Sequence, residues 1–504
     1  MKKVLVLFII ALALRVWFVS NHNIIFWFDQ ARDAIQATQL WHGNLKLMGP
    51  SASGTNDTVY HGVLYYYLIA PWYGIFGGDP TWPSYFLSFL GALAIPLNYW
   101  LGFAITKKKS IALTLAFLLS ISSQAVVLST LLGNPTIALV AFPLFFLSTW
   151  KLFYENQQSK RWWLVLGLSY GWLVQAAIWL FPLIFIPIIS FYLLYLSDQK
   201  SLKKQIKFSS ILISVIATLF VTSSMIAAQI KLASTGVFTI QRVVEGNSGH
   251  ERASMYLLSE YVFAYGKKIT NVYFPSHAIV ALILFGFCAT QLRKLEFKKR
   301  QFYSLLFFGP ILISIIFPRN NDHFFFMIDI PLYLLLIESI QLINIPRKSL
   351  QVLILGLVFV LSNLSELNYL KQNHLSTFDT WGSSLTDSLS LVDVTYTAAE
   401  SHPFSIDTYT EAYRYNTIWS YLYSWYGQSK YGYTPTYTGT SQVGMIHYNL
   451  LPEATEVENT HFAVVQPNVV LPQPFLDDFL SIQARKTNKE AFKQEFGTIK
   501  LYSY

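Results

Sequence analysis

The sequence contains a single cysteine, Cys288, in 504 residues, and only 12% of its residues are charged. One cysteine excludes an intrachain disulfide and any zinc site built from cysteine pairs. Soluble domains carry about 25% charged residues, so charge is too scarce here to cover a soluble body of this size. Hydrophobic residues make up 53% and aromatic residues 17% of the chain. This composition predicts an integral membrane protein with aromatic belts at both interfaces.

The sequence also has no Walker-type phosphate loop and no internal repeat, which disfavours ATP-driven transport by this chain alone. The net charge of +9 comes from basic residues that stand in short gaps between apolar runs. These gaps are Lys2-Lys3, 107–109, Lys160-Arg161, 200–207, 293–300 and Arg347-Lys348. This is the positive-inside pattern of membrane proteins, and it does not indicate a nucleic-acid partner.

Apolar runs of about 17 to 25 residues, the length that crosses a bilayer as a helix, occur at eleven places. They lie at 4–20, 83–104, 111–130, 136–153, 162–178, 181–197, 208–230, 276–292, 301–317, 324–345 and 349–364. One long helix between 162 and 197 is an alternative, and it would reverse the membrane orientation of every later segment. With Lys2-Lys3 in the cytoplasm, eleven crossings place the C-terminus outside. We expect a multi-pass protein of the plasma (inner) membrane with large outer loops at 21–82 and 231–275.

After Asn363 the hydropathy falls, and Ser, Thr, Tyr and Asp become frequent. Strand-like runs at 404–408 and 461–465 and helix-like runs at 413–426 and 475–484 predict a small α/β domain. The expected organisation is a polytopic α-helical transmembrane domain over 1–364 and an extracytoplasmic α/β domain over 375–504.

The first outer loop opens with a charged cluster, Asp29, Arg32 and Asp33, directly after the first apolar run. On a helix over 29–42, with about 100° per residue, these three residues share one face. Gly43 suits the helix end. The opposite face is apolar and is expected to lie in lipid, with the helix flat on the membrane. An ordinary interfacial helix without catalytic function is the alternative.

Other polar motifs also fall in the outer segments. His61 precedes Tyr65 and Tyr66, Asn134 forms an Asn-Pro turn, a glycine-rich loop holds Arg242 and His250, and a short turn holds Arg319 and His323.

In this order, the motifs resemble the polytopic glycosyltransferases of the GT-C fold. The similar branch is the family 39-like one, with the protein O-mannosyltransferases and the lipid A aminoarabinose transferase. The resemblance covers roughly residues 1 to 350 and rests on 29–33, 61–66, Asn134-Pro135 and 319–323. Gln30 departs from the pattern, because the mannosyltransferases have a second acid there. Val63 replaces a proline, and neutral Asn134 replaces an acid of some relatives.

The resemblance implies transfer of a sugar from a polyprenyl-phosphate donor to a cell-envelope lipid, glycan or protein at the extracytoplasmic face. It implies that Asp29 is the base, with Asp33 as a second acid. The groups expected to hold the donor phosphate are Arg32, His61, Arg242, His250, Arg319 and His323. Tyr65, Tyr66 and Asn134 are expected to contact substrate. A divalent metal is left open, although Gln30 weakens metal ligation by adjacent acids.

Two other functions stay open. A lipid-linked oligosaccharide flippase is the leading non-enzyme alternative, although transporters normally carry ionisable residues near the bilayer midplane and these spans have few. A polysaccharide polymerase or ligase is the enzymatic alternative. Structural roles also stay open for single residues: Arg319 as a helix-end anchor, His61 as an interface anchor and Asn134 as an Asx-Pro turn.

Overall fold

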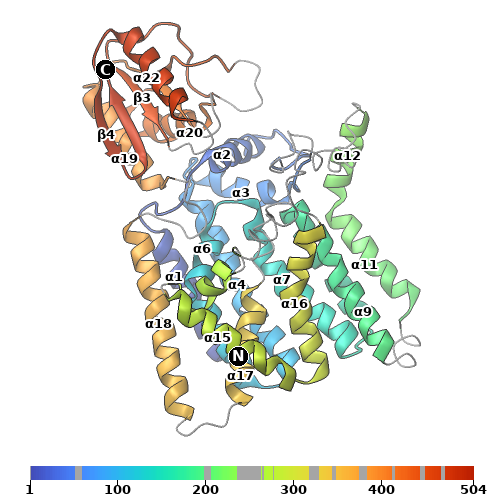
Figure 1. Ribbon diagram of the computed structural model, residues 1–504. Helices are drawn as coiled ribbons and strands as arrows, with labels where there is room; N and C mark the ends of the chain where they lie inside the picture. Colours follow the sequence, from blue (N-terminus) through green and yellow to red (C-terminus); the bar gives the residue numbers. More distant parts are fainter. Residues whose placement is uncertain are drawn as a thin grey trace.

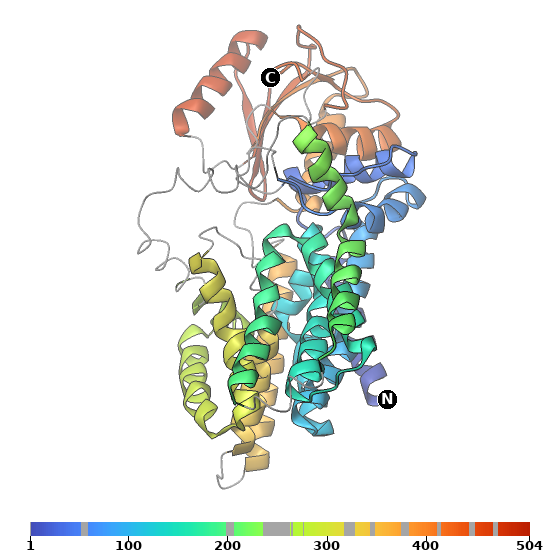
Figure 2. The ribbon, with the colours of Figure 1, turned by 90° about the vertical axis from the view of Figure 1, so that its right-hand side faces the viewer.

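The computed structural model describes residues 2–51, 59–197, 206–234, 263, 266–275, 277–316, 328–342, 348–373, 383–410, 415–442, 449–466 and 472–504. A helical bundle forms the body, and a small domain with a five-stranded sheet sits at one end of it (Figure 1). The N-terminus lies at the opposite end of the bundle from the C-terminus (Figures 1 and 2). The predicted fold class, a polytopic α-helical membrane protein with a small C-terminal α/β domain, is confirmed.

The bundle helices follow the predicted apolar runs. They are α1 (Lys2–Val19), α4 (Thr81–Thr106), α5 (Lys109–Ile121), α6 (Ser123–Thr130), η1 (Asn134–Ile137), α7 (Ala138–Thr149), η2 (Trp150–Tyr154), α8 (Lys160–Ala176), η3 (Ile178–Ile184), α9 (Phe185–Ser197), α11 (Phe208–Val221), α12 (Ser223–Ser234), α15 (Ala278–Gln291), η5 (Leu292–Lys294), α16 (Phe297–Ile316), α17 (Asp329–Leu342) and α18 (Lys348–Gln372). Two further helices, α2 (Phe28–Trp41) and α3 (Leu64–Ile75), lie at the end of the bundle that carries the C-terminal domain (Figure 1).

Within the described ranges, four helical stretches are long and apolar enough to cross a membrane: Thr81–Thr106, Asn134–Tyr154, Ile178–Leu196 and Leu350–Gln372. Three bent helix pairs raise the number to seven if each pair is one span. Eleven spans were predicted. In their described parts, several of these runs form helices that are too short or not apolar enough to count as a membrane span by themselves. The described part of α17, for example, has 14 residues, about 21 Å of helix.

The apolar stretch between 162 and 197 contains two helices, α8 and the η3–α9 segment, so the alternative of one long helix is wrong. The chain turns at Ala177, which is extended at φ −152° and ψ 119°. The Ala177 amide still bonds to the Leu173 carbonyl at 3.0 Å, so the end of α8 is satisfied.

One predicted span, 111–130, is broken into α5 and α6, which meet at 60°. Ser122 stands at the break, and its hydroxyl accepts a hydrogen bond from the Ala125 amide at 3.3 Å. The buried side chain of Asn363, on α18, accepts from the Ser123 amide at 2.8 Å and from the Ser123 hydroxyl at 3.0 Å. The break is stable in an apolar surrounding because polar side chains bond the backbone groups that it frees.

The sheet of the C-terminal domain has the order β2-β1-β3-β5-β4. Its strands are β1 (Ser405–Tyr409), β2 (Thr436–Tyr437), β3 (His461–Val465), β4 (Phe492–Phe496) and β5 (Ile499–Ser503). Strand β1 runs parallel to β2 and β3, whereas β5 is antiparallel to β3 and β4. The helices are α19 (Leu385–Ala398), α20 (Thr417–Leu422), η7 (Tyr423–Gly427), α21 (Gln428–Tyr431) and α22 (Gln473–Thr487). The two predicted strands are β1 and β3, and the β4–β5 hairpin was not predicted.

The C-terminal domain docks on the segment that leads into α2. Ile25 and Ser384 form an antiparallel bridge. Flanking this bridge, the Leu385 amide donates to the Ile24 carbonyl at 2.8 Å and the Phe26 amide donates to the Ser383 carbonyl at 3.0 Å. The start of α2 is therefore held from the side of the C-terminal domain as well as by the bundle.

Candidate active site

Helix α2 carries the charged cluster and spans Phe28–Trp41, one residue earlier at each end than predicted. Gly43 follows the end of the helix with φ +91°, a conformation that glycine adopts without strain. The apolar face does not lie in lipid as expected. Ala31 and Ala34 are fully buried and Ile35 is almost so, because α2 packs against α3 and the protein core.

Gln30 fixes the N-terminal end of α2. Its side-chain oxygen accepts from the Trp27 amide at 3.1 Å, which satisfies a free amide at the helix start. Its side-chain nitrogen donates to the Leu132 carbonyl at 2.6 Å, in the turn between α6 and η1. Both bonds together need an amide, because a carboxylate cannot donate to a carbonyl. Gln30 thus has a structural role at the start of α2 that an ionised acid could not fill.

Arg32 lies between the two carboxylates of α2. Its Nη1 is 2.7 Å from Asp29 Oδ1, and its Nε and Nη2 donate to Asp33 Oδ1 at 3.0 and 2.8 Å. The Asp29 side chain is 61% exposed, whereas the Asp33 side chain is only 2% exposed. The Asp29 carboxylate is therefore exposed, whereas the buried Asp33 carboxylate holds the guanidinium on the side of the protein interior.

Burial and charge act against each other in this cluster. Burial raises the pKa of Asp33 to about 6, against the opposing effect of the Arg32 guanidinium. Burial works to lower the pKa of Arg32, but the carboxylates of Asp33 and Asp29 outweigh it and hold that pKa above its usual range. The cluster thus holds two acidic side chains and one basic side chain.

The two tyrosines at the start of α3 approach the same cluster. The Tyr66 hydroxyl donates to Asp33 Oδ1 at 3.0 Å, and the Tyr65 and Tyr66 rings lie 6.0 Å apart. The Tyr65 hydroxyl is buried and has no hydrogen-bond partner in the described part of the chain. The structure thus brings Asp29, Arg32, Asp33, Tyr65 and Tyr66 together, as predicted for residues that share a site. Their individual roles stay predictions.

His61 and Asn134 both contact the turn at the end of α8. The His61 Nδ1 accepts from the Ile178 amide at 3.1 Å, so the imidazole is neutral while this bond holds and carries its proton on Nε2. The Asn134 amide donates to the Ala176 carbonyl. A Cβ on Gly62 would lie 1.8 Å from Gln175 Oε1, so only glycine fits after His61. These bonds hold the loop before α3 and the turn at Asn134 against the end of α8.

Four predicted phosphate-binding residues, Arg242, His250, Arg319 and His323, lie outside the described residues. Their convergence with Asp29 stays a prediction. Within the described ranges, no group of three or more His, Cys, Asp or Glu side chains is arranged to hold a metal ion. Asp29 and Asp33 are both bonded to Arg32, so they do not fit a shared metal.

Sequence reasoning missed three buried charges in the bundle: Arg15 on α1, Lys268 on the short helix Gly266–Tyr273, and Asp329 at the start of α17. Arg15 and Asp329 each stand inside a predicted apolar span, at 4–20 and 324–345. A lone charge in such a run is a signal of function, because burying it in the membrane is costly. The prediction that the spans have few ionisable residues overlooks Arg15 and Asp329.

The arrangement of these elements matches solved structures over almost the whole chain. ArnT from Cupriavidus metallidurans, bound to undecaprenyl phosphate, matches with a TM-score of 0.62 over 99% of this chain and 97% of that one, at 10% identity. The chain has the GT-C fold. The apo structure of the same ArnT matches with a TM-score of 0.59 at 11% identity, over the same shares of both chains. The resemblance predicted from the sequence is confirmed.

The family model described as dolichyl-phosphate-mannose-protein mannosyltransferase matches residues 60–227. The matched part contains the His61-to-Tyr66 segment and the Asn134 turn, whereas α2 and the 319–323 turn lie outside it. No protein of curated function matches the sequence. The family model thus covers the chain from the residues before α3 to the first part of α12.

Proposed function

We propose that this protein is an integral membrane glycosyltransferase that moves a sugar from a polyprenyl-phosphate donor to an acceptor at the extracytoplasmic face. The N-terminus is then cytoplasmic and the C-terminal domain extracytoplasmic. The observation that carries the proposal is the exposed Asp29 carboxylate beside the buried Arg32, at the end of the bundle where α2, α3 and the C-terminal domain meet. The ArnT-like fold supports it, because that protein was solved with undecaprenyl phosphate bound.

In the proposed step, Asp29 takes the proton of the acceptor hydroxyl while the acceptor oxygen attacks the anomeric carbon. The bond between that carbon and the phosphate oxygen breaks, and its electron pair leaves with the polyprenyl phosphate. Arg32 holds Asp29 in position at 2.7 Å. The buried Asp33 carboxylate bonds both Arg32 and the Tyr66 hydroxyl and so fixes the guanidinium. A positioned base of this kind contributes about 10²–10⁴-fold to a rate.

The charges of the α2 cluster indicate that other groups must bind the leaving phosphate. The α2 cluster has two acidic side chains for one basic side chain, and three of the five N–H groups of Arg32 already bond these acids. Arg32 alone is therefore a weak ligand for a leaving phosphate. The proposal assigns that task to Arg319 and His323, with Arg242 and His250, and it gives His61 Nε2 and the Tyr65 hydroxyl as uncharged donors.

The test uses the full-length protein in liposomes with undecaprenyl-phosphate-linked hexoses and pentoses and a membrane extract as acceptor, and it measures released undecaprenyl phosphate. Asp29→Asn is expected to lower the rate at least about 100-fold. Asp393→Asn is the matched control, because Asp393 is a partly exposed acid paired with Lys430 at 2.8 Å in the C-terminal domain. Full turnover by Asp29→Asn would remove the assignment of the base.

The buried charges at Arg15, Lys268 and Asp329 favour one alternative, because transporters carry such groups inside the membrane. A lipid-linked oligosaccharide flippase would move the intact lipid-linked sugar without breaking the sugar–phosphate bond. A fluorescent undecaprenyl-linked sugar that reaches the other leaflet uncleaved, at the same rate in wild type and Asp29→Asn, would establish that function instead.

A further inference from the structure

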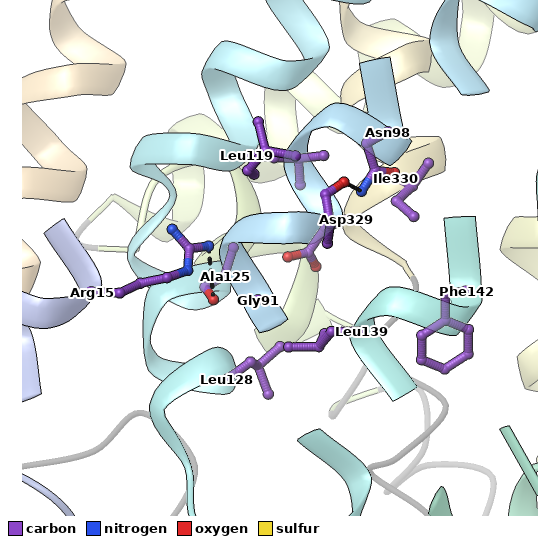
Figure 3. A pocket seen from close by; sticks show the side chains of 12 residues that line it. Arg15, Gly91, Asn98, Leu119, Ala125, Leu128, Leu139, Phe142, Asp329 and Ile330 are labelled. Carbon is purple, nitrogen blue, oxygen red and sulfur yellow. Dashed lines mark hydrogen bonds between the residues drawn. The ribbon is translucent and has the colours of Figure 1, made fainter. Parts of the chain in front are cut away.

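A cavity with three polar side chains in its wall, Arg15, Asn98 and Asp329, lies inside the bundle, away from the charged cluster of α2. It has a volume of about 40 Å³ and is lined by residues of α1, α4, α5, α6, α7 and α17. Most of its wall is apolar, including Ile95, Leu119, Leu128 and Phe142. Figure 3 shows the guanidinium of Arg15 and the carboxylate of Asp329 facing this space from opposite sides.

Arg15 is almost completely buried, and its partners are uncharged. Its Nε donates to the Ser129 hydroxyl at 2.7 Å, its Nη1 to the Ala11 and Ser120 carbonyls at 3.0 and 3.4 Å, and its Nη2 to the Ala125 carbonyl at 3.4 Å. These bonds satisfy carbonyls around the α5–α6 break. A guanidinium has five N–H groups, so one on Nη2 is left. Among the described acids, no ion pair with Arg15 within 4.0 Å is present.

On the other side of the cavity, two buried acceptors lack hydrogen bonds. Asp329 Oδ1 and Asn98 Oδ1 have no partner within the described ranges, although the Asn98 amide nitrogen donates to the Ala94 carbonyl at 2.9 Å. Lys268 Nζ is 4.0 Å from Asp329 Oδ1, which is too long for a hydrogen bond. A buried carboxylate oxygen without a hydrogen bond is costly.

We propose that ordered water occupies this cavity and bridges Arg15 to Asp329, with Asn98 as a further partner. A water needs roughly 10–15 Å³ of such space and two to four polar partners. The cavity volume of about 40 Å³ is therefore enough for about three waters. The bridge makes Arg15 and Asp329 a water-linked ion pair between α1 and α17, inside the membrane domain.

The Arg15–Asp329 pair connects to the candidate active site through the contacts of α6. Arg15 holds α6 through Ser129 and Ala125, and the turn after α6 holds Gln30 of α2 through the Leu132 carbonyl. Asp329 directly follows the segment that contains Arg319 and His323 in the sequence. The bridge therefore links the support of Asp29 to the start of α17. This consequence rests on the proposed function, whereas the bridge itself does not.

The test is a double-mutant cycle on the apparent melting temperature of the full-length protein in detergent, which needs no transfer assay. Asp329→Asn and Arg15→Met are each expected to lower the melting temperature, because each breaks the bridge and leaves buried polar groups on the other side of the cavity without a hydrogen-bond partner. In the Arg15→Met background, the drop caused by Asp329→Asn is expected to be at least halved. An undiminished drop, or one that only Lys268→Gln diminishes, would overturn the bridge.

Glu338→Gln is the matched control, because Glu338 is a buried acid on the same helix that bonds Lys299 at 2.7 Å and Tyr303 at 2.6 Å. Its effect should be the same with and without Arg15→Met. If Arg15→Met yields no folded protein, Asn98→Leu decides. A hydrated cavity predicts a lower melting temperature for that variant, because leucine displaces the water that solvates Asp329. An unchanged or higher melting temperature would mean a dry cavity and refute the proposal.

Discussion

Replacing Tyr421 is expected to loosen α2 without changing any charged residue of the candidate active site. Tyr421, on α20, is almost fully buried. Its ring stacks on that of Phe26 at 5.6 Å and 30°, and its hydroxyl donates to the Gly78 carbonyl. It therefore joins the C-terminal domain to the start of α2 and to the turn after α3, the two helices that carry the charged cluster and its tyrosines.

The two changes at this position separate packing from hydrogen bonding. Tyr421→Phe removes one buried hydrogen bond and leaves the ring, which costs about 1 kcal/mol net. Tyr421→Ala also removes the stacked ring, and truncation of a buried aromatic costs about 3–5 kcal/mol. If α2 opens only when this contact breaks, amide hydrogen exchange in residues 24–41 accelerates roughly tenfold for each 1.4 kcal/mol lost.

The assay is hydrogen exchange by mass spectrometry on the full-length protein, with transfer kinetics alongside. Tyr421→Ala is expected to speed exchange in 24–41 and to lower kcat, while exchange in the buried η1–α7 segment stays as in wild type. Tyr426→Ala is the control, because Tyr426 bonds Asp393 and Lys430 on the same domain and not α2. Unchanged exchange in 24–41 for Tyr421→Ala would show that the bundle alone positions α2.

Two further predictions test single contacts. Gln30→Glu is expected to destabilise the start of α2 by about 1–3 kcal/mol, because a carboxylate would face the Leu132 carbonyl at the position of a 2.6 Å bond; hydrogen exchange in 24–41 as slow as in wild type would contradict this. His461 is buried, its Nδ1 is 2.8 Å from the Ser405 hydroxyl and its Nε2 is 3.1 Å from Gln483 Oε1. Burial lowers the pKa of His461 from 6.5 to about 4, so its contribution to stability is complete above pH 6.5 and is lost as the pH falls toward 4, by about 3 kcal/mol in total. Exchange in β1 and β3 should accelerate over that range in wild type but not in His461→Gln, and equal pH profiles for the two proteins would refute the assignment.

The sequence predicted the helix of Asp29, Arg32 and Asp33 well, because three charged residues at helical spacing beside an apolar run have few other arrangements. It predicted the wrong neighbour for the opposite face. Periodicity shows that Ala31, Ala34 and Ile35 avoid water. It cannot show whether lipid or another helix covers them, and small residues suit close packing against α3.

Elements with weak patterns were missed for a different reason. Strand β4 reads Phe-Lys-Gln-Glu-Phe and is mostly exposed at the sheet edge, so neither face carries a clear apolar alternation. Arg15 and Asp329 were missed because an apolar average hides single charges within a run. The carbonyls and cavity that accommodate them come from helices far apart in the sequence, such as α6 and α17.

The contact between Asn363 and Ser123 also orders events during synthesis. The free amide of Ser123 at the α5–α6 break finds its acceptor 240 residues later in the chain. Until α18 has been synthesised, the Ser123 amide at the break lacks the acceptor that it has in the folded protein. The early helices can therefore insert before the last one, but they reach their final arrangement only once it docks, and a chain truncated after α17 should be recognised and degraded as incomplete.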